Sequence, residues 1–408
     1  MARVAVAGTG VVGLACAFHL LADGHALTLV DPAPEGDKCS WGNAGAIAVT
    51  EVVPAAVPGV FRRVPGWLFD PLGPLALRPA HAPRMLPWLL SFARVARPAE
   101  TARIAAALAA LLGRVYSDLA PVLAALGLAD ELHRAGALTV YRSTAALRAD
   151  AAEWALKRRH GIECEEMSGE AARALEPALA PAVAAGVMTP AWSHVSDPKQ
   201  IWAALLAHAR RAGARVLSGT VADIGTPGRV VLASGETVAC DAVVVAAGAW
   251  SGALARQAGD AVLLESERGY NVTIPAPGVS LGREVIFAEQ KFVATPLSIG
   301  LRIGGAAEFA GLAAPANMAR SAALARLGAA WLPGLSQTGA RAWMGQRPAT
   351  PDSLPVLGPA TRRPDVFYAF GHGHLGLTLA ATSGRLIADA IAGRTSFDLV
   401  PYAARRFR

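Results

Sequence analysis

Residues 3–13 read RVAVAGTGVVG and residues 26–31 read ALTLVD. The first stretch is a short strand-like run that leads into Gly8, Gly10 and Gly13, at the spacing of a turn between a strand and a helix. A helical pattern follows, and the second stretch is typical of another strand. Strand, glycine turn, helix and strand in this order predict a βαβ unit that binds a dinucleotide.

The three glycines have separate tasks in such a unit. Gly8 permits the tight turn, Gly10 lets the backbone approach a pyrophosphate, and Gly13 lets the helix pack closely on the strand. Because the helix begins at this turn, we expect the free N–H groups of Val11 and Val12 and the positive end of the helix dipole to face the phosphates.

An acidic residue, Asp31, closes the second strand 18 positions after Gly13. Its carboxylate is expected to accept hydrogen bonds from the adenosine ribose hydroxyls. The same carboxylate would repel a 2′-phosphate, which disfavours NADP. The motif does not distinguish NAD from FAD.

Composition places the chain among globular proteins with large cores. Of its residues 53% are hydrophobic and 17% are charged, which is ample for large cores. Two domains are expected, because 408 residues exceed what one hydrophobic core usually serves. The net charge of +7 is spread thinly, with 38 Lys+Arg against 31 Asp+Glu. No nucleic-acid partner is expected, because such proteins gather basic residues on one face. Attraction to an anionic substrate or lipid remains an alternative to a plain solvated surface.

Cysteine usage and hydropathy favour a cytoplasmic location. The cysteines lie far apart, which argues against disulfides and against a metal site. The apolar stretch 4–21 resembles a signal peptide, but it lacks a basic leader and a cleavage site. No transmembrane helix is expected, because no stretch reaches 18 uninterrupted apolar residues. The cysteines are Cys16, Cys39, Cys164 and Cys240.

Beyond residue 99 the pattern alternates between strands and helices. Helices are expected at about 100–128, 199–212 and 378–392. Strands are expected at 137–141, 216–224, 230–233, 237–238, 242–246, 270–274, 284–288, 300–304 and 366–370.

Four later segments carry motifs of one known family, in the family's order. They are CSWGNAG at 39–45, VVVAAGAWS at 243–251, GQRP at 345–348 followed by PDSLP at 351–355, and GHGHLGLT at 371–378. With the N-terminal glycine turn, they make the sequence resemble the D-amino-acid oxidase-like flavoproteins, above all the bacterial D-amino-acid dehydrogenase branch. The resemblance covers nearly the whole chain.

The resemblance implies that the dinucleotide is FAD, held without a covalent bond. It implies an α/β fold in which a discontinuous Rossmann-like FAD-binding domain is joined to an α+β substrate domain on a mostly antiparallel sheet. We expect the FAD-binding domain to comprise residues 1–60, 190–260 and 340–408. The substrate domain would comprise residues 61–189 and 261–339.

The cofactor residues implied by the resemblance come from all these motifs. The C-terminal turn opens a helix, so its N–H groups would stabilise negative charge at the N1–C2=O end of a reduced flavin. Cys39 is the cysteine that the resemblance places near the ring. The predicted FAD residues are Gly8, Gly10, Val11, Val12, Gly13, Asp31, Ser40, Asn43, Ala44, Gly45, Val221, Ala247, Gly248, Trp250, Arg347, Gly371, His372, Gly373, His374, Leu375, Gly376, Leu377 and Thr378.

Arg347 is the predicted carboxylate binder, because in the resembled family the arginine of Gly-x-Arg-Pro binds the substrate carboxylate. A guanidinium suits this task, since it offers two parallel N–H bonds and stays charged. The alternative is a structural ion pair of Arg347 with Asp352 or Glu308. Arg302 is the second candidate anion binder.

Tyr270 and the histidines of the C-terminal turn are further candidates. Tyr270 resembles a Gly-Tyr element near the active site, where its hydroxyl would orient the amine; a core position is the alternative. His372 and His374 would tune the flavin or contact substrate, with structural hydrogen bonding as the alternative. No side-chain base is required, because oxidation in this family resembles hydride transfer from the substrate Cα to flavin N5.

The resemblance implies an enzyme that oxidises the C–N bond of a D-amino acid to an imine and then a 2-oxo acid. A cyclic imino acid such as D-proline or hydroxyproline is included, and the electron acceptor is oxygen or a quinone or carrier. The alternatives are a secondary-amine oxidase of the sarcosine or glycine type, an NAD-linked hydroxy-acid dehydrogenase, and a flavoprotein subunit of an amine dehydrogenase complex.

Residues 54–99 form a separate feature, rich in proline, tryptophan and arginine. The recurring prolines predict an irregular, partly helical excursion. Three hypotheses stay open for it: a lid, a dimer surface, or a peripheral contact with the inner face of a membrane that passes electrons to quinone.

Overall fold

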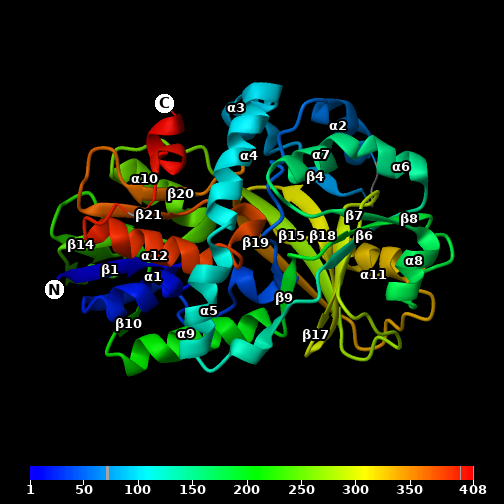
Figure 1. Cartoon of the computed structure of the whole chain (residues 1–408). Helices are drawn as coiled ribbons and strands as arrows, with labels where there is room; N and C mark the ends of the chain where they lie inside the picture. The colour runs from blue at the N-terminus through cyan, green and yellow to red at the C-terminus, as the bar shows by residue number, and fades with distance from the viewer. Residues whose placement is uncertain (70–72, 396, 408) are drawn as a thin grey trace.

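Two large β-sheets form the frame of the chain (Figure 1). The computed structural model describes residues 1–69, 73–395 and 397–407. Within them a six-stranded and a nine-stranded sheet stand side by side, and helices pack on their outer faces. The mixed α/β class predicted from the sequence is confirmed.

The six-stranded sheet contains the predicted βαβ unit. Its strands are drawn from the beginning, middle and end of the chain, and all neighbours pair in parallel except at the last edge. Buried aliphatic runs suit such strands, because helices cover both faces of a parallel sheet. In spatial order they are β10 (Arg215–Ser218), β2 (Ala26–Asp31), β1 (Arg3–Ala7), β14 (Ala242–Val245), β21 (Val366–Phe370) and β20 (Val356–Pro359).

Helices α1 (Val11–Ala22), α9 (Pro198–Arg211) and α12 (Ala380–Ile391) cover one face of this sheet (Figure 1). Their buried residues join the sheet in one core cluster. Helix α1 crosses α12 closely, because Gly384 leaves no room for a side chain: a Cβ there would lie 2.5 Å from the Ala15 carbonyl oxygen.

The nine-stranded sheet is mostly antiparallel, with two parallel pairs, β16 with β6 and β18 with β4. Residues 341–349 pair into this sheet, although we expected them in the FAD-binding domain. The strands are β19 (Arg341–Ala349), β15 (Glu265–Ile274), β18 (Gly300–Phe309), β17 (Phe292–Leu297), β16 (Glu284–Phe287), β6 (Ala137–Tyr141), β8 (Ala185–Thr189) and β7 (Glu165–Ser168), with β4 (Leu75–Leu77) beside β18.

Smaller elements surround the two sheets. The helices are α2 (Val60–Phe69), α3 (Leu86–Val95), α4 (Pro98–Leu112), α5 (Val115–Ala125), α6 (Thr144–Ala149), α7 (Ala151–Arg159), α8 (Gly169–Leu175), α10 (Ser251–Gln257) and α11 (Ala319–Trp331). The strands are β3 (Ala46–Ile47), β5 (Leu132–His133) and β9 (Ser193–Val195), and β11 (Val221–Asp223), β12 (Arg229–Leu232) and β13 (Thr237–Ala239).

Several boundaries differ from the prediction. The strand expected at 216–224 is two strands in different sheets. β10 pairs with β2 as far as Ser218, the chain then turns at Gly219, and β11 pairs with β12. The single helix expected at 100–128 is α4 and α5, separated at 113–114. The strands expected at 270–274 and 300–304 are each ten residues long, since β15 pairs with β18 over 267–274 and with β19 over 265–273.

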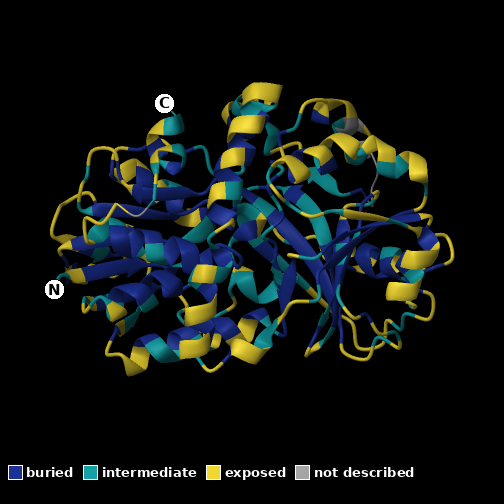
Figure 2. Cartoon of the chain, in the orientation of Figure 1, coloured by how far each residue is buried: buried dark blue, intermediate teal, exposed yellow. Residues whose placement is uncertain are grey.

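The segment Pro98–Ala125 is long and apolar enough to cross a membrane by length and composition, which we did not expect. Ile104, Leu108 and Leu111 of this segment pack in the core beside α1 and α12. Core helices of globular proteins meet the same criterion. Figure 2 shows the outward side of these helices exposed and the strands of both sheets buried.

Candidate active site

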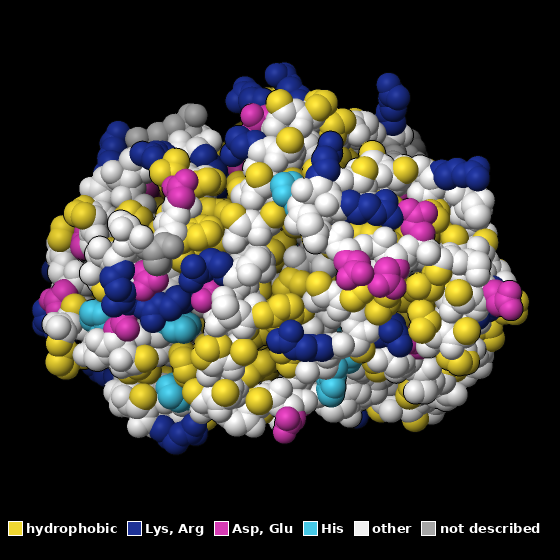
Figure 3. Space-filling model, in the orientation of Figure 1, with side chains coloured by type: hydrophobic (Ala, Val, Ile, Leu, Met, Phe, Trp, Pro, Cys, Tyr) yellow, Lys and Arg dark blue, Asp and Glu magenta, His cyan; other side chains and the backbone are white. Residues whose placement is uncertain are grey.

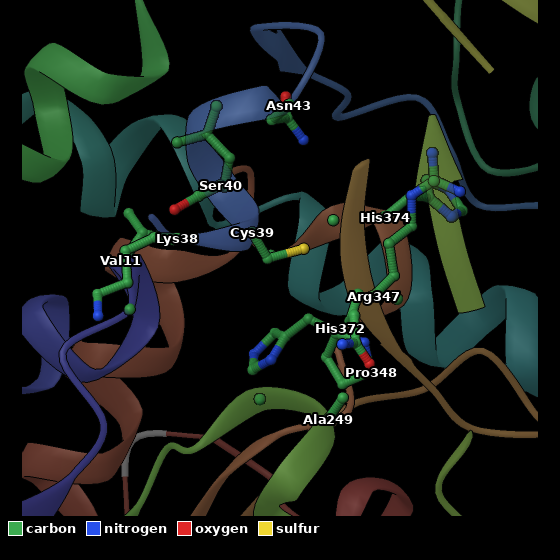
Figure 4. A pocket seen from close by; sticks show the side chains of 18 of the residues that line it. Val11, Lys38, Cys39, Ser40, Asn43, Ala249, Arg347, Pro348, His372 and His374 are labelled. Carbon is green, nitrogen blue, oxygen red and sulfur yellow. The ribbon is translucent and has the colours of Figure 1, made fainter. Parts of the chain in front are cut away.

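A cavity of about 930 Å³ is lined by residues of both sheets. This volume lies at the upper end of the range for cofactor and small-molecule sites, roughly 300–1,000 Å³. Figure 4 shows side chains from the N-terminal segment, the 345–348 segment and the C-terminal turn pointing into it. The five sequence motifs therefore meet at one place.

The glycine turn after β1 forms one end of the cavity. Gly8 has φ +111°, and a Cβ there would lie 2.4 Å from the Ala246 carbonyl oxygen. A Cβ on Gly13 would lie 2.1 Å from the Gly8 carbonyl oxygen, so this glycine sets the approach of α1 to the turn. A Cβ on Gly10 would meet nothing within 4 Å, because Gly10 faces the cavity. This open cradle at the N-terminus of α1 fits a pyrophosphate.

Asp31 lies in the wall beside this turn. Its carboxylate accepts hydrogen bonds from the backbone N–H groups of Thr9 and Ala33, both at 2.9 Å, and from Lys38 Nζ at 2.8 Å. Burial alone would raise the pKa of Asp31, but these donors outweigh it and hold the pKa below its ordinary value. The carboxylate is thus ionised and can still accept ribose hydroxyls, since each oxygen has more than one acceptor site. Lys38 was not predicted.

The loop 39–45 crosses the middle of the cavity. Ser40 Oγ is buried without a hydrogen-bond partner among the described residues, and Ser40 lines the cavity. The ring of Trp343 supports the loop and leaves no room for a Cβ on Gly42 or Gly345. Its indole N–H donates to Asp37 at 2.9 Å.

Arg302, the second candidate anion binder, holds this loop from behind. Its Nη1 donates to the backbone carbonyls of Trp41 at 2.8 Å and Asn43 at 2.6 Å, and its Nε donates to Thr273. The side chain is buried and does not line the cavity. Arg302 therefore positions the loop.

The C-terminal turn closes the other side of the cavity. His372 is buried and hydrogen-bonds Ser383 at 2.8 Å, and burial lowers its pKa to about 3, so it is a neutral structural residue. His374 points into the cavity, to which its side chain is exposed (Figure 4). The Thr378 hydroxyl accepts from the backbone N–H of Ala48 and donates to the carbonyl of Ala46. The following helix begins at Ala380 instead of the expected 378.

Arg347 lies at the centre of the cavity wall, where Figure 4 shows it beside Cys39 and His374. Its Nη1 donates to Glu267 Oε1 at 2.7 Å, which is neither of the two ion pairs considered from the sequence. Asp352 pairs with Arg406 and Glu308 with Arg78. A Cβ on Gly269 would lie 2.3 Å from the Arg347 Cζ, so the glycine makes room for the guanidinium.

Tyr270 lines the cavity but its hydroxyl is engaged. It donates to Glu308 and accepts the backbone N–H of Asn317 at 3.1 Å. Burial, and then the bond to Glu308, raise the pKa of the phenol. The side chain is buried, so the expected role in orienting an amine would require it to give up the bond to Glu308.

Two further acids, Glu51 and Glu284, line the cavity and were not predicted. Glu51 accepts from Lys157 Nζ at 2.5 Å. Glu284 is buried without an ion pair among the described residues, and burial raises its pKa to about 8. Trp192 and Thr295 beside it lower the pKa in part, and the charge of Glu51 raises it.

Most of the predicted FAD residues come together in this wall. Those that line the cavity are Gly8, Gly10, Val11, Val12, Asp31, Ser40, Asn43, Ala44, Val221, Ala247, Gly248, Trp250, Arg347, His372, Gly373, His374, Gly376 and Leu377. Those that lie behind it are Gly13, Gly45, Gly371, Leu375 and Thr378.

The residues present fit FAD. The open face of Gly10 would hold the pyrophosphate, Asp31 the adenosine ribose, and the unpartnered Ser40 hydroxyl and the C-terminal turn the flavin. FAD supplies a hydride acceptor when bound. The chain supplies a guanidinium and a carboxylate in the wall of the same cavity.

Comparison with known proteins gives consistent matches along the whole chain. The family model described as DAO, FAD dependent oxidoreductase, matches residues 3–390. A D-amino-acid oxidase of Bradyrhizobium diazoefficiens is 36% identical over 99% of this chain and 99% of its own. A D-amino acid dehydrogenase of Rhizobium rhizogenes is 32% identical over 99% of this chain and 100% of its own.

Solved structures share the fold. The glycine oxidase from Bacillus cereus aligns with a TM-score of 0.72 at 18% identity, over 98% of each chain. The iminodiacetate oxidase from Chelativorans sp. BNC1 aligns with a TM-score of 0.73 at 21% identity, also over 98% of each chain.

We predict opposite consequences for two neighbouring glycines. Gly13→Ala lowers the melting temperature of the FAD-free protein by several degrees, because a backbone clash of about 1–3 kcal/mol exceeds the roughly 1 kcal/mol that Ala gains in a helix. Gly10→Ala leaves that temperature nearly unchanged, since Gly10 has φ −65° and open space, but abolishes FAD retention. Thermal unfolding of the apoprotein and absorbance near 450 nm of the purified protein measure the two effects. Equal melting temperatures for the two variants contradict the packing role of Gly13.

We also predict a pH-dependent contribution of Glu284 to stability. Its folded pKa, about 8, lies above the unfolded value of 4.5, so its stabilising contribution is complete below about pH 4.5 and is lost as the pH rises through about 8. The melting temperature of the natural protein, relative to that of Glu284→Gln, should therefore fall between pH 5 and pH 9. If the melting temperatures of the two proteins instead change with pH in the same way across this range, Glu284 is ionised in the folded protein.

Proposed function

The chain belongs to the FAD dependent oxidoreductase family DAO, and we propose that it oxidises the C–N bond of a D-amino acid to an imine, which hydrolyses to a 2-oxo acid. A D-amino-acid oxidase and a D-amino acid dehydrogenase, each at least 32% identical over nearly the whole chain, support this reaction. With FAD as the cofactor, the alternative of an NAD-linked dehydrogenase is withdrawn.

The observation that carries the proposal is the position of Arg347. Its guanidinium stands in the wall of the cavity that receives FAD, and a single ion pair, to Glu267, holds it there. The remaining N–H groups have no partner among the described residues and can bind a planar carboxylate as a fork. A carboxylate held at this point would place the carbon next to it inside the cavity that the FAD-binding residues also line.

The other cavity residues orient the substrate and exclude water. Cys39 and His374 are exposed to the open cavity, and the ordinary pKa values of a thiol and an imidazole, about 8.5 and about 6.5, leave both mainly neutral near pH 7. A neutral thiol is a poor nucleophile, which supports FAD held without a covalent bond to Cys39.

A secondary-amine substrate is the second candidate. The structures that share the fold include a glycine oxidase and an iminodiacetate oxidase, and the latter is named for a secondary amine. A cyclic imino acid such as D-proline combines both features, because it is a D-amino acid whose amine is secondary.

The electron acceptor is proposed to be a membrane quinone, reached through a surface on helices α2 and α3. Four large apolar side chains there are at least 41% exposed: Phe61, Leu68, Leu86 and Leu90. The same part of the chain also carries exposed arginines: Arg62, Arg84, Arg94 and Arg97. Figure 3 shows apolar and basic side chains together at the top of the molecule.

This surface lies close to the substrate end of the cavity. The Trp88 indole on α3 donates to the backbone carbonyl of Ala349 at 3.1 Å, two residues beyond Arg347. Apolar side chains with a basic rim are typical of proteins that rest on anionic lipid. The surface therefore favours peripheral contact with the inner face of the membrane over the lid and dimer hypotheses. Residues 70–72 lie outside the described part of the chain.

The reaction is tested by anaerobic bleaching of the bound flavin with a panel of D-, L- and N-alkyl amino acids. We expect D-amino acids or D-imino acids to bleach the flavin fastest. Arg347→Ala should raise the substrate concentration for half-maximal bleaching on the order of 100-fold at unchanged FAD content, since a buried charge contact is worth about 2–5 kcal/mol. Bleaching by L-amino acids alone would overturn the proposed function, and an unchanged half-maximal concentration would overturn the role of Arg347.

The membrane contact is tested by flotation of the FAD-loaded enzyme with vesicles rich in phosphatidylglycerol. At low salt the natural protein should float with the vesicles, and at high salt it should not, because screening weakens the arginine contribution. Leu86→Gln with Leu90→Gln should reduce flotation at least tenfold, whereas Leu175→Gln, on an exposed leucine of α8, serves as the matched control. Failure of the natural protein to float excludes the contact.

A further inference from the structure

The ion pair between Glu267 and Arg347 is built into the sheet beneath the cavity. Glu267 on β15 stands directly opposite Arg347 on β19 in the antiparallel register. Side chains that face each other across such a pair have Cβ atoms about 4.5–5.5 Å apart, which holds the two charges side by side. Gly269, two residues along β15, leaves space for the guanidinium. The pair is therefore positioned by backbone pairing.

The pair uses only part of its hydrogen-bonding capacity. One N–H of Arg347, at Nη1, meets one oxygen of Glu267, at 2.7 Å. Both side chains are about a quarter exposed, and both line the cavity. Among the residues that the structure describes, Glu267 Oε2 and the Nε and Nη2 of Arg347 have no hydrogen-bond partner. An acceptor and a group of donors therefore face the cavity next to each other.

The groups around this pair carry little charge of their own. Cys39 and His374 line the cavity from the 39–45 loop and the C-terminal turn, and the ordinary pKa values of a thiol and an imidazole, about 8.5 and about 6.5, leave both mainly neutral near pH 7. Glu51, another acid of the cavity wall, pairs with Lys157, and Lys291 also lines the cavity. Glu267 and Arg347 place one negative and one positive charge side by side in the cavity wall.

An α-amino acid has the complementary arrangement, since its carboxylate and ammonium are attached to one carbon. Moving such a zwitterion out of water leaves its ammonium unpaired if the site offers only an arginine, and burying an unpaired charge is strongly unfavourable. We propose that Glu267 binds the substrate amino group while Arg347 binds the carboxylate, so that the pair forms a receptor for the zwitterion. This rests on the proposed function, and it assigns the amine contact that Tyr270, engaged with Glu308, does not supply.

The pair also determines selectivity. A 2-hydroxy acid or a simple carboxylate can occupy Arg347 but brings no cation to Glu267. An amine without a carboxylate can occupy Glu267 but leaves Arg347 without an anion. Only a molecule with both groups on one carbon satisfies both residues and leaves their mutual ion pair intact.

Two non-reacting ligands separate these contributions. 2-Aminoisobutyrate carries the zwitterion but has no Cα hydrogen to lose, and isobutyrate is the same molecule without the amine. Their dissociation constants are measured on the FAD-loaded enzyme by calorimetry or by the shift of the flavin absorbance. Glu267→Gln should raise the dissociation constant of 2-aminoisobutyrate by about 10- to 100-fold. The dissociation constant of isobutyrate should stay unchanged or fall, because Arg347 loses a competing anion. Glu267→Asp should restore part of the binding of 2-aminoisobutyrate.

Other outcomes overturn the assignment. If Glu267→Gln weakens the binding of both ligands equally, Glu267 only holds Arg347 in place. If it tightens the binding of both equally, Glu267 only competes for Arg347. A melting temperature and FAD content equal to those of the natural protein show that the variants are folded. If the natural enzyme binds neither ligand and Arg347→Ala changes no bleaching rate, the proposed function fails; if Arg347→Ala weakens both ligands but Glu267→Gln weakens neither, the amine contact alone fails.

Discussion

A close contact of three backbone segments at the end of β1 underlies the cofactor end of this molecule. Gly8 reaches the carbonyl of Ala246, and Gly13 reaches the carbonyl of Gly8, with no side chain between them. The N-terminus of α1 therefore arrives at the edge where β1 and β14 both end, and the Gly248 turn that follows β14 is brought to the same edge. Parallel strands that end together create the crevice in which α/β folds bind ligands.

Much of the fold could be predicted from the sequence, because its signals are local. The glycine spacing and the short aliphatic runs identified β1, α1, β2 and β21, and Asp31 was placed correctly at the end of its strand. Long-range pairing was not predictable in the same way. Whether β10 continues past Gly219, or β15 extends back to Glu265, depends on a partner strand distant in sequence, and single-strand patterns carry no information on that partner.

The residues of the site also separate into those that local sequence motifs predict and those that depend on long-range pairing. Family motifs identified Arg347 and the C-terminal turn, since these are contiguous stretches. Glu267 was missed, although it stands three residues before Tyr270, because its role arises from register with a residue 80 positions away. Arg302 was predicted as an anion binder, but it donates to backbone carbonyls of the 39–45 loop. An arginine on a strand looks the same in the sequence whether its side chain binds a ligand or the backbone.

The assembly of the six-stranded sheet from three distant parts of the chain has a consequence for biosynthesis. β1 leaves the ribosome long before β21, which pairs with β14, and before α12, which packs on α1. N-terminal segments begin to fold first during synthesis. Here the cofactor crevice stays incomplete until β21 and α12 have been synthesised. Over that interval the apolar faces of β1 and α1 lack the partners that cover them in the folded protein.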